Sequence, residues 1–262
     1  MSQPAMTPWM LARVGARLLL LQARWDPARM QGPGLAFALE PWLAVCWSAD
    51  PAGLTAARRR HLEYFNTHPV AAWLTAGIVC REEAAAAALT GAAREAAITK
   101  ISTLKAKYGA SLAGLYDSFF WGALRPASAL AGVLAAQAAY RLGSPCALGW
   151  AAAAALTVYN VPAFAARVLG LRRGVADGER AVASLIRLPV QSWILGLRRA
   201  AVAGALLAFA VAAGLLGGAD RLTAGLTFAA GLVLTWRGVS PLVQLGFAGL
   251  GGMAASGAGL LR

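Results

Sequence analysis

The polar residues best able to do chemistry lie between positions 58 and 83, where carboxylates, amides and hydroxyls interrupt an otherwise apolar sequence. Asn66 or Thr67, followed closely by a proline, is typical of a helix start, because a capping side chain and a first-turn proline both suit that position. The helix is expected to end at Glu82 and Glu83, where acids oppose the helix dipole unless a partner or ligand compensates them. A solvated surface turn would also explain the acidic pair.

These groups suit a neutral, hydroxyl-rich ligand if they share a site. An amide both donates and accepts hydrogen bonds, as does a hydroxyl, and a carboxylate accepts them. A sugar presents many hydroxyls and no charge, so a first shell of amides, carboxylates and a stacking aromatic ring is expected. The candidate substrate-binding residues in this region are therefore Asn66, Thr67, Glu82 and Glu83.

A second candidate position is Asp117, which is closely followed by three consecutive aromatic residues at 119–121. An acid beside aromatics at the mouth of an apolar segment is typical either of an interfacial belt or of a polar cavity, and both interpretations stay open. In the second interpretation Asp117 is a further substrate-binding residue. His61 and His68 have no recognisable catalytic neighbours, so we expect structural or interfacial roles for both.

The sequence contains no enzyme motif such as GxxxxGK[ST], GxGxxG, HExxH or GxSxG. Cys46, Cys80 and Cys146 lie far apart and lack a CxxC partner or a neighbouring histidine pair. Neither a metal site nor a disulfide framework is therefore expected. No cofactor is expected.

Composition is typical of a membrane protein. Hydrophobic residues make up 59% of the chain and charged residues 13%, against roughly 45–50% and about 25% in soluble domains. The formal net charge is +13, but the basic residues lie between apolar stretches, as in cytoplasmic loops, and not in one nucleic-acid-binding patch. No nucleic-acid partner is expected. The apolar run at 18–21 is too short for a cleavable signal peptide, so we expect none.

Uncharged runs long enough to cross a bilayer lie in the second half of the chain. Runs of 25, 20 and 24 residues occupy 142–166, 200–219 and 238–261, and roughly 20 residues are needed to span. Two runs of 15 residues, 126–140 and 222–236, reach only about 22 Å as helices. These two must recruit flanking residues, thin the bilayer or stop partway.

The first half differs, because several of its uncharged runs are about ten residues long and are interrupted by acids and prolines. Such runs are typical of re-entrant or interfacial segments. The predicted fold is therefore an all-α polytopic membrane protein with re-entrant or interfacial broken helices in its N-terminal half and transmembrane helices in its C-terminal half. Buried core helices of a soluble domain are the alternative for the N-terminal half.

Charge and hydropathy together divide the chain into five predicted segments. Seven arginines and two acids lie between 167 and 199, and this excess predicts a cytoplasmic location. The segments are an N-terminal amphipathic or interfacial segment (1–57), a re-entrant region with the polar site (58–126), a transmembrane hairpin (127–170), a cytoplasmic basic amphipathic segment (171–199) and C-terminal transmembrane helices (200–262).

Four stretches of the sequence resemble one known family. They are WDPARMQ at 25–31, RRHLEYFNTHP at 59–69, the pair Glu82–Glu83, and DSFFWGALRP at 117–126. In order and spacing they resemble the IID membrane component of the mannose/fructose/sorbose family of the bacterial phosphoenolpyruvate-dependent sugar phosphotransferase system. The second and fourth strings are long and specific.

The resemblance implies a multi-pass protein of the bacterial inner membrane that pairs with a IIC subunit to form the path of a hexose-type sugar. It implies that separate IIA and IIB proteins carry the phosphoryl group, so the chain is expected to be no enzyme and to hold no phosphorylation site. A higher oligomer of IIC–IID heterodimers is also expected. On matching positions, the polar candidates for the translocation site are Asn66, Thr67, Glu82, Glu83 and Asp117.

The chain departs from the family pattern beside Asp117. The family usually has GPLAGVGDP here, whereas Tyr116 stands in place of a glycine and Ser118 in place of a proline. A bulky side chain where the backbone normally approaches closely predicts a reshaped cavity, and with it a changed sugar preference. The alternative function is a regulatory or structural membrane protein derived from the same family that no longer transports.

Overall fold

The computed structural model describes residues 3–213 and residue 229, which are helical apart from short connections. These residues contain two isolated bridges and no β-strand, so the all-α prediction is confirmed for the described part of the chain. The elements are α1 (Pro8–Leu18), the 3-10 turn η1 (Leu21–Arg24), α2 (Gly32–Cys46), α3 (Pro51–Leu62), α4 (Ala71–Ala87), α5 (Gly91–Tyr116), the π-helix η2 (Asp117–Leu124), α6 (Arg125–Arg141), α7 (Ala147–Asp177), α8 (Glu179–Ile186) and α9 (Val190–Ala213).

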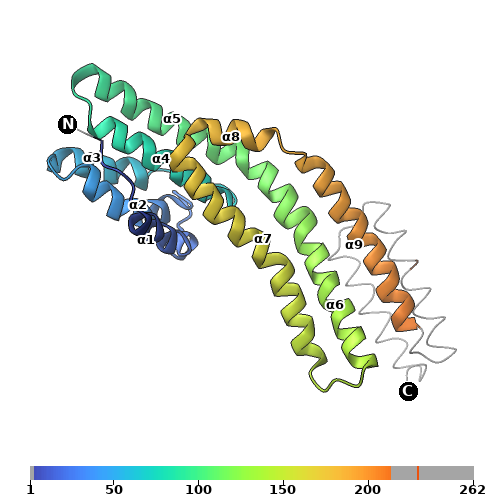
Figure 1. The fold of residues 1–262 in the computed structure, drawn as a ribbon. Helices are drawn as coiled ribbons and strands as arrows, with labels where there is room; N and C mark the ends of the chain where they lie inside the picture. The colour runs from blue at the N-terminus through green and yellow to red at the C-terminus, as the bar shows by residue number, and fades with distance from the viewer. Residues whose placement is uncertain (1–2, 214–228, 230–262) are drawn as a thin grey trace.

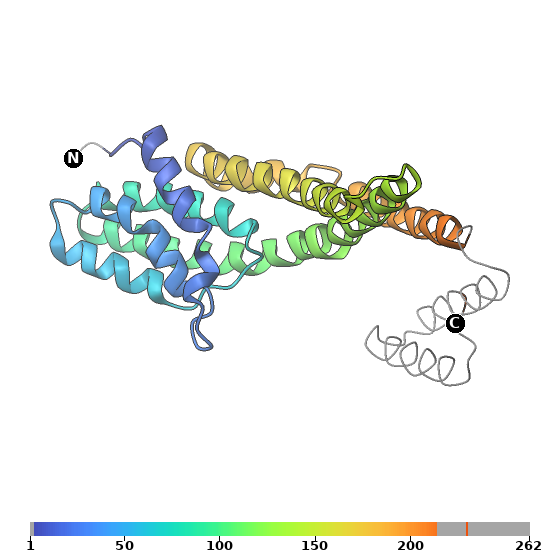
Figure 2. The same cartoon turned by 90° about the horizontal axis from the view of Figure 1, so that it is seen from below.

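The helices form an N-terminal bundle and a long arm (Figure 1). The bundle consists of α1 to α4 with the first part of α5, and the arm consists of α6, α7 and α9. In Figure 2 the arm again extends away from the bundle, so the separation does not depend on the viewing direction.

The N-terminal bundle has an apolar core of its own. Leu35, Leu39 and Leu43 follow one face of α2 at four-residue spacing and are fully buried. Helix α4 is buried at every position from Ala71 to Cys80. A helix that is apolar on all sides must be enclosed by others, and α4 is accordingly the central helix that contacts α2, α5 and α7.

Helices α1 and α3 begin with conventional caps. Thr7 Oγ1 accepts a hydrogen bond from the Met10 amide at 3.2 Å, and Asp50 Oδ1 accepts one from the Gly53 amide at 2.8 Å. A proline follows each cap in the first turn of the helix. Both caps satisfy backbone donors that a helix start leaves free.

Helix α4 begins differently from the prediction. His68 Nδ1 accepts a hydrogen bond from the Val70 amide at 3.1 Å. Asn66 is exposed, and the buried hydroxyl of Thr67 has no hydrogen-bond partner in the described structure. The N-cap residue of α4 is Val70, and no side chain caps this helix, so the predicted cap at Asn66 or Thr67 is wrong.

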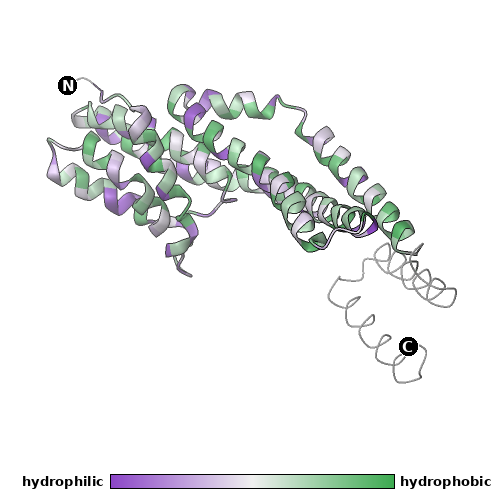
Figure 3. Ribbon diagram, turned by 60° about the horizontal axis from the view of Figure 1, so that its bottom comes forward, coloured by the Kyte–Doolittle hydropathy of each residue, from purple (hydrophilic) through white to green (hydrophobic). Residues whose placement is uncertain are grey.

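Within the described part of the chain, three helices are long and apolar enough to cross a membrane. They comprise 51 residues at Gly91–Arg141, 31 at Ala147–Asp177 and 23 at Val190–Ala212, and a rise of about 1.5 Å per residue makes each longer than a hydrocarbon core of about 30 Å. The short run at 126–140 gains its length from the residues before it, because α5, η2 and α6 are continuous. Figure 3 shows the arm largely green and pale, with most hydrophilic residues on the N-terminal helices and near α8.

The prediction of membrane helices in the second half is confirmed as far as the described residues extend. Helices α6 and α7 form a hairpin whose turn lies at 142–146. Most of the predicted C-terminal segment, 200–262, lies outside the described residues. The orientation in the membrane, the boundaries of the five segments and the re-entrant character of the N-terminal helices stay predictions.

A close crossing of α4 and α7 joins the arm to the bundle. A Cβ atom at Gly77 would lie 2.4 Å from the Leu171 carbonyl oxygen, and one at Gly174 would lie 2.6 Å from the Leu74 carbonyl oxygen. Real Cβ atoms do not approach this closely, so both positions require glycine. Small residues allow helix backbones to approach in this way, and Gly170 and Gly174 have the four-residue spacing typical of such contacts.

We expect Gly77→Val to separate α4 from α7, because the new side chain has no space against the Leu171 carbonyl. Overpacking of this kind costs about 1–3 kcal/mol or more. Thermal unfolding in detergent, followed by tryptophan fluorescence, should show a lower Tm. Gly114→Val is the matched control, because the Cβ at Gly114 meets no described atom within 4 Å. Equal effects of the two variants would contradict a close crossing at Gly77.

Candidate functional site

The stretches at 25–31 and 59–69 are held together inside the N-terminal bundle. The Gln31 side chain donates a hydrogen bond to the Thr67 carbonyl at 2.8 Å and accepts one from the Thr67 amide at 3.1 Å. The backbone amide of Gln31 donates to the Phe65 carbonyl at 2.8 Å. Gln31 is buried, so these bonds satisfy polar groups that water does not reach. The loop before α4 is thereby fixed in position.

Glu83 lies at the centre of a buried polar cluster. Arg60 donates to both of its carboxylate oxygens, from Nε at 2.6 Å and from Nη2 at 2.7 Å. Trp47 Nε1 donates at 2.9 Å, and His61 Nε2 lies 2.8 Å from Oε1. A carboxylate has about four acceptor positions, and all are occupied here. A sugar hydroxyl could bind Glu83 only by displacing one of these donors.

The charges in this cluster follow from burial and pairing. Burial raises the pKa of Glu83, but the hydrogen bonds from His61 and Arg60, with the charge of Arg60, outweigh it and lower the pKa to about 2. Burial lowers the pKa of His61 more than Glu83 raises it, so the ring is neutral near pH 7. The bond to Glu83 then assigns the ring proton to Nε2 and leaves the buried Nδ1 without a partner.

Two further cations surround the cluster on the α5 side. Lys105 is 4% exposed; its ammonium group donates to the Arg60 carbonyl and lies 3.6 Å from Glu63. Lys100 contacts Glu82 at 3.0 Å and Glu179 of α8 at 3.5 Å. Glu82 and Glu83 therefore face different partners. Both lie before the last turn of α4, so the prediction that the helix ends at this pair is wrong by one turn.

The stretch at 117–126 meets the second stretch through aromatic rings. His68 stacks on Phe120 with ring centroids 5.2 Å apart, and Trp121 approaches its edge at 5.0 Å. Tyr116 lies 6.1 Å from the same ring. The stretch at 25–31 thus contacts the stretch at 59–69 through Gln31 and Thr67, which in turn contacts the stretch at 117–126 through His68 and Phe120. The pair Glu82–Glu83 contacts the stretch at 59–69 through the bond of Glu83 to Arg60.

The structure does not bring all predicted site residues together. Asn66 is exposed and Asp117 half-buried, and neither side chain has a hydrogen bond or ion pair within the described residues. Thr67 is buried with its hydroxyl unpaired. Glu82 and Glu83 bind the separate cations described above. The candidate substrate-binding role of all five residues stays a prediction, with Asn66 and Asp117 the two that combine unpaired polar groups with solvent exposure.

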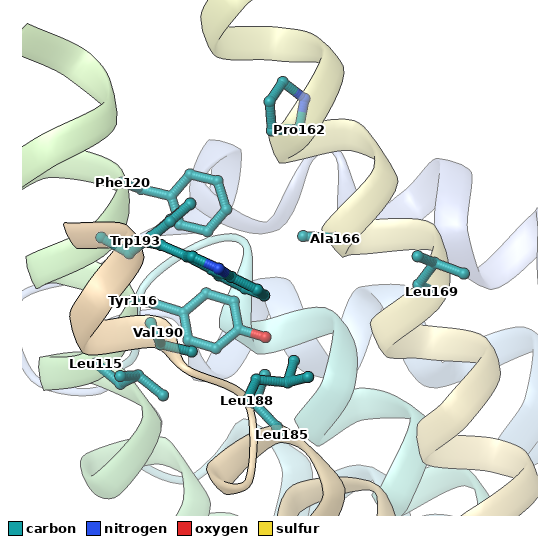
Figure 4. A pocket seen from close by; sticks show the side chains of 11 residues that line it. Leu115, Tyr116, Phe120, Pro162, Ala166, Leu169, Leu185, Leu188, Val190 and Trp193 are labelled. Carbon is teal, nitrogen blue, oxygen red and sulfur yellow. The ribbon is translucent and has the colours of Figure 1, made fainter. Parts of the chain in front are cut away.

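A cavity of about 290 Å³ lies beside this aromatic group, between η2, α7 and the α8–α9 connection. In Figure 4 the rings of Tyr116, Phe120 and Trp193 face Pro162, Ala166 and Leu169 of α7 across it. Tyr116, the residue that departs from the family pattern, lines this cavity; the predicted reshaping of a sugar cavity stays a prediction. The lining is almost entirely apolar, unlike the first shell expected for a sugar. Its further lining residues are Leu115, Phe119, Leu185, Leu188 and Val190.

Sequence reasoning missed Gln31, Trp47 and Arg60, which hold the candidate region in place. Gln31 and Arg60 belong to recognised strings, so family resemblance contained a signal for both. A carboxylate in an apolar helix needs a cation, and this need could have pointed to Arg60 among the three consecutive arginines. Trp47 follows α2, and nothing in its local sequence indicates a bond to Glu83.

We expect Glu83→Gln to lower stability far more than Glu82→Gln. Removing one partner of a buried ion pair leaves the other charge uncompensated and costs about 3–5 kcal/mol, whereas a partly exposed pair such as Glu82–Lys100 contributes about 0–1 kcal/mol. Membrane abundance and Tm in detergent are the measurements. A Glu83→Gln protein with parental abundance and Tm would show that the cluster does not hold the bundle together.

Stability should also fall as the pH falls from 7 to 5. Burial, and to a lesser degree the charge of Arg167, lowers the pKa of His68 to about 4. Below the unfolded-state pKa of about 6.5, the unfolded chain therefore binds a proton that the folded chain does not, so acid favours unfolding. His61 acts in the same direction. His68→Asn keeps an acceptor for the Val70 amide but cannot titrate, and Tm should depend less steeply on pH in this variant. Identical slopes would refute this role of His68.

Relatives with assigned roles are similar to parts of the chain. The mannose-specific EIID component of Escherichia coli (strain K12) is 31% identical over 159 residues, which cover 61% of this chain and 52% of the relative. The fructose permease IID component of Bacillus subtilis (strain 168) is 33% identical over 156 residues, 57% of this chain and 50% of the relative. The chain thus spans about half the length of these two relatives.

Two solved structures share the fold. One, described as a membrane protein, superposes with a TM-score of 0.70, and a chain of the mannose transporter ManYZ in complex with Microcin E492 superposes with a TM-score of 0.58. Each is 23% identical, and each comparison covers 98% of both chains. At this identity the likeness establishes an all-helical membrane fold.

The family comparison covers most of the described chain. The family model for the PTS system mannose/fructose/sorbose family IID component matches residues 5–214. This range includes every recognised string and the contacts between them. The chain belongs to the IID components of the mannose/fructose/sorbose family of the PTS system.

Proposed function

We propose that the chain is the IID membrane subunit of a phosphotransferase-system sugar permease and forms, with a IIC subunit, the path of a hexose-type sugar. The observation that carries this proposal is the family match over residues 5–214, whose characteristic stretches meet at one junction of bundle and arm. Relatives described as mannose-specific and as a fructose permease support a hexose-type cargo.

The sugar contacts of this subunit are proposed to lie on the exposed side of that junction. Asn66 offers a free amide two residues from His68, and Trp121, which is 50% exposed, packs against the His68 ring. An exposed indole beside amide and carboxylate groups suits the apolar face and the hydroxyls of a sugar. Asp117, at the start of the same π-helix as Trp121, supplies the carboxylate. The IIC subunit would complete the site.

Phosphoryl transfer is proposed to occur on the separate IIA and IIB proteins. The chain has two histidines; His61 is fully buried and His68 is 2% exposed. His61 also bonds Glu83, and His68 accepts a hydrogen bond from the Val70 amide. Neither ring is accessible to an incoming phosphoryl donor, which supports a subunit without its own phosphorylation site.

Exposed apolar side chains support the proposal that the chain binds a IIC subunit. Trp9, Leu19, Leu20 and Trp25, in and around α1 and η1, are each at least half exposed, although these elements are not among the candidate membrane spans. Such a concentration is typical of a protein or membrane contact. The assembly is proposed to be a higher oligomer of IIC–IID heterodimers.

Uptake measurements test the function directly. The chain is expressed with its cognate IIA, IIB and IIC proteins in a host without a related permease, and uptake of mannose, glucose, fructose, sorbose and N-acetylated amino sugars is compared with and without it. We expect uptake of at least one sugar only when the chain is present. Transport that does not need the chain, or none at all despite normal membrane abundance, would favour the regulatory or structural alternative.

Within the same experiment, Tyr116→Gly tests whether the reshaped region affects the path. Tyr116 is buried beside His68 and lines the cavity, so its removal should change relative sugar preference. Tyr140→Gly is the matched control, because Tyr140 is 66% exposed on α6. Glycine in a helix costs about 1 kcal/mol of stability in either variant. Unchanged preferences in Tyr116→Gly would separate this residue from the path.

A further inference from the structure

A second cavity, far more polar than the first, lies on the N-terminal bundle. It has a volume of about 400 Å³ and lies between α1, η1, α2 and α3. Four arginines and a single carboxylate line it, and its other lining residues are apolar. The charged residues are Arg17, Arg24, Arg29, Arg58 and Glu40.

Three of these guanidinium groups are held in place by bonds that use only some of their donors. Arg17 Nε donates to the Phe37 carbonyl at 2.8 Å, and its guanidinium lies 3.9 Å from the centre of the Phe37 ring. Arg29 Nε donates to Asp26 at 3.1 Å. Arg58 pairs with Glu40 through Nε and Nη2. Each guanidinium has five N–H donors, so every one of the three keeps donors free.

The fourth arginine has no compensating charge. Arg24 makes no side-chain hydrogen bond or ion pair within the described residues, although it lines the same cavity as three other cations. Like charges gathered around one cavity repel, and the one lining carboxylate, Glu40, is already bound by Arg58. The cavity therefore has an excess of positive charge that an anion would neutralise.

We propose that this cavity binds a phosphate-class oxyanion, as a free phosphate, a phosphate monoester or the phosphodiester of a lipid headgroup. Guanidinium groups bind phosphate through paired, charge-assisted hydrogen bonds. Here they come from α1, η1, the turn before α2, and α3, and a tetrahedral phosphate can accept from several directions, whereas a carboxylate accepts in one plane. The bonds to Phe37, Asp26 and Glu40 hold three of the four guanidinium groups in place before the anion binds, which reduces the entropy lost on binding.

The surroundings of the cavity decide which sources to test. Leu19, Leu20 and Trp25 are 50% or more exposed; the two leucines lie between Arg17 and Arg24 in the sequence, and Trp25 follows Arg24. Apolar side chains beside cations are typical of contact with an anionic membrane surface. A lipid headgroup and a soluble phosphate must therefore be separate arms of the experiment.

The experiment measures binding of three probes to the full chain, purified in detergent, or with IIC where only the complex is stable. Inorganic phosphate and glucose 6-phosphate are titrated by calorimetry against a chloride control of equal ionic strength. For the lipid, Tm is compared in nanodiscs of phosphatidylcholine with and without phosphatidylglycerol, because a ligand that binds the folded state stabilises it. Response to soluble phosphates identifies a soluble ligand, and response to phosphatidylglycerol alone identifies a headgroup; either supports the site.

Variants locate the binding. Arg24→Gln should lower the affinity for whichever probe binds by at least about tenfold, since it removes charge-assisted hydrogen bonds. Phe37→Leu keeps the charge and the backbone carbonyl that Arg17 bonds, but removes the ring against which the Arg17 guanidinium packs, and should weaken binding severalfold. Arg59→Gln is the matched control, because Arg59 is exposed and next to Arg58 but does not line the cavity.

Two results would overturn the proposal. One is the absence of binding by all three probes. The other is an equal loss of binding in Arg59→Gln and Arg24→Gln, which would reflect the general positive charge of the chain. Sugar uptake is a separate readout, so failure of this site leaves the permease function untouched.

Discussion

The N-terminal bundle depends on one buried negative charge. Glu83 comes from α4, Arg60 and His61 from α3, and Trp47 from the residue after α2, so a single carboxylate ties three helices together. An isolated carboxylate in this position would be very unfavourable, and only complete pairing makes it tolerable. Directional bonds then fix the relative positions of the helices more narrowly than apolar packing does, since packing alone permits sliding and rotation.

From this fixed bundle the structure extends to the membrane helices through two contacts of different chemistry. The crossing of α4 and α7 is possible because Gly77 and Gly174 have no side chain. The contact of His68 with η2 depends on aromatic rings. The loop between Asn66 and Val70 is thereby fixed from both sides, by Gln31 in the bundle and by Phe120 of η2. Its few exposed polar groups are consequently presented from a rigid support.

Prediction from sequence succeeded where composition or run length carries the information. The all-α fold and the membrane helices follow from uncharged runs, and the family follows from long strings. The cap of α4 was assigned wrongly, because Asn66 and Thr67 are the usual capping types, whereas the helix begins at Ala71 after Val70 and has no side-chain cap. The partners of Glu83 could not be derived from spacing, since Trp47 and Arg60 reach it through tertiary packing. Glu82 and Glu83 are adjacent in sequence, yet their successive positions on α4 point them to different neighbours.

The π-helix at Asp117–Leu124 has a consequence for the long helix that contains it. Buried residues recur at every fourth position along that helix, at Leu104, Tyr108, Leu112, Tyr116, Phe120, Leu124, Ser128 and Gly132. In a regular α-helix a four-residue step overshoots one turn by about 40°, so this stripe would wind progressively around the rod. The wider turns of a π-helix, with their i→i+5 bonds, rotate the stripe backwards over its middle third. The insertion thus reduces the winding of this stripe between the bundle and the arm.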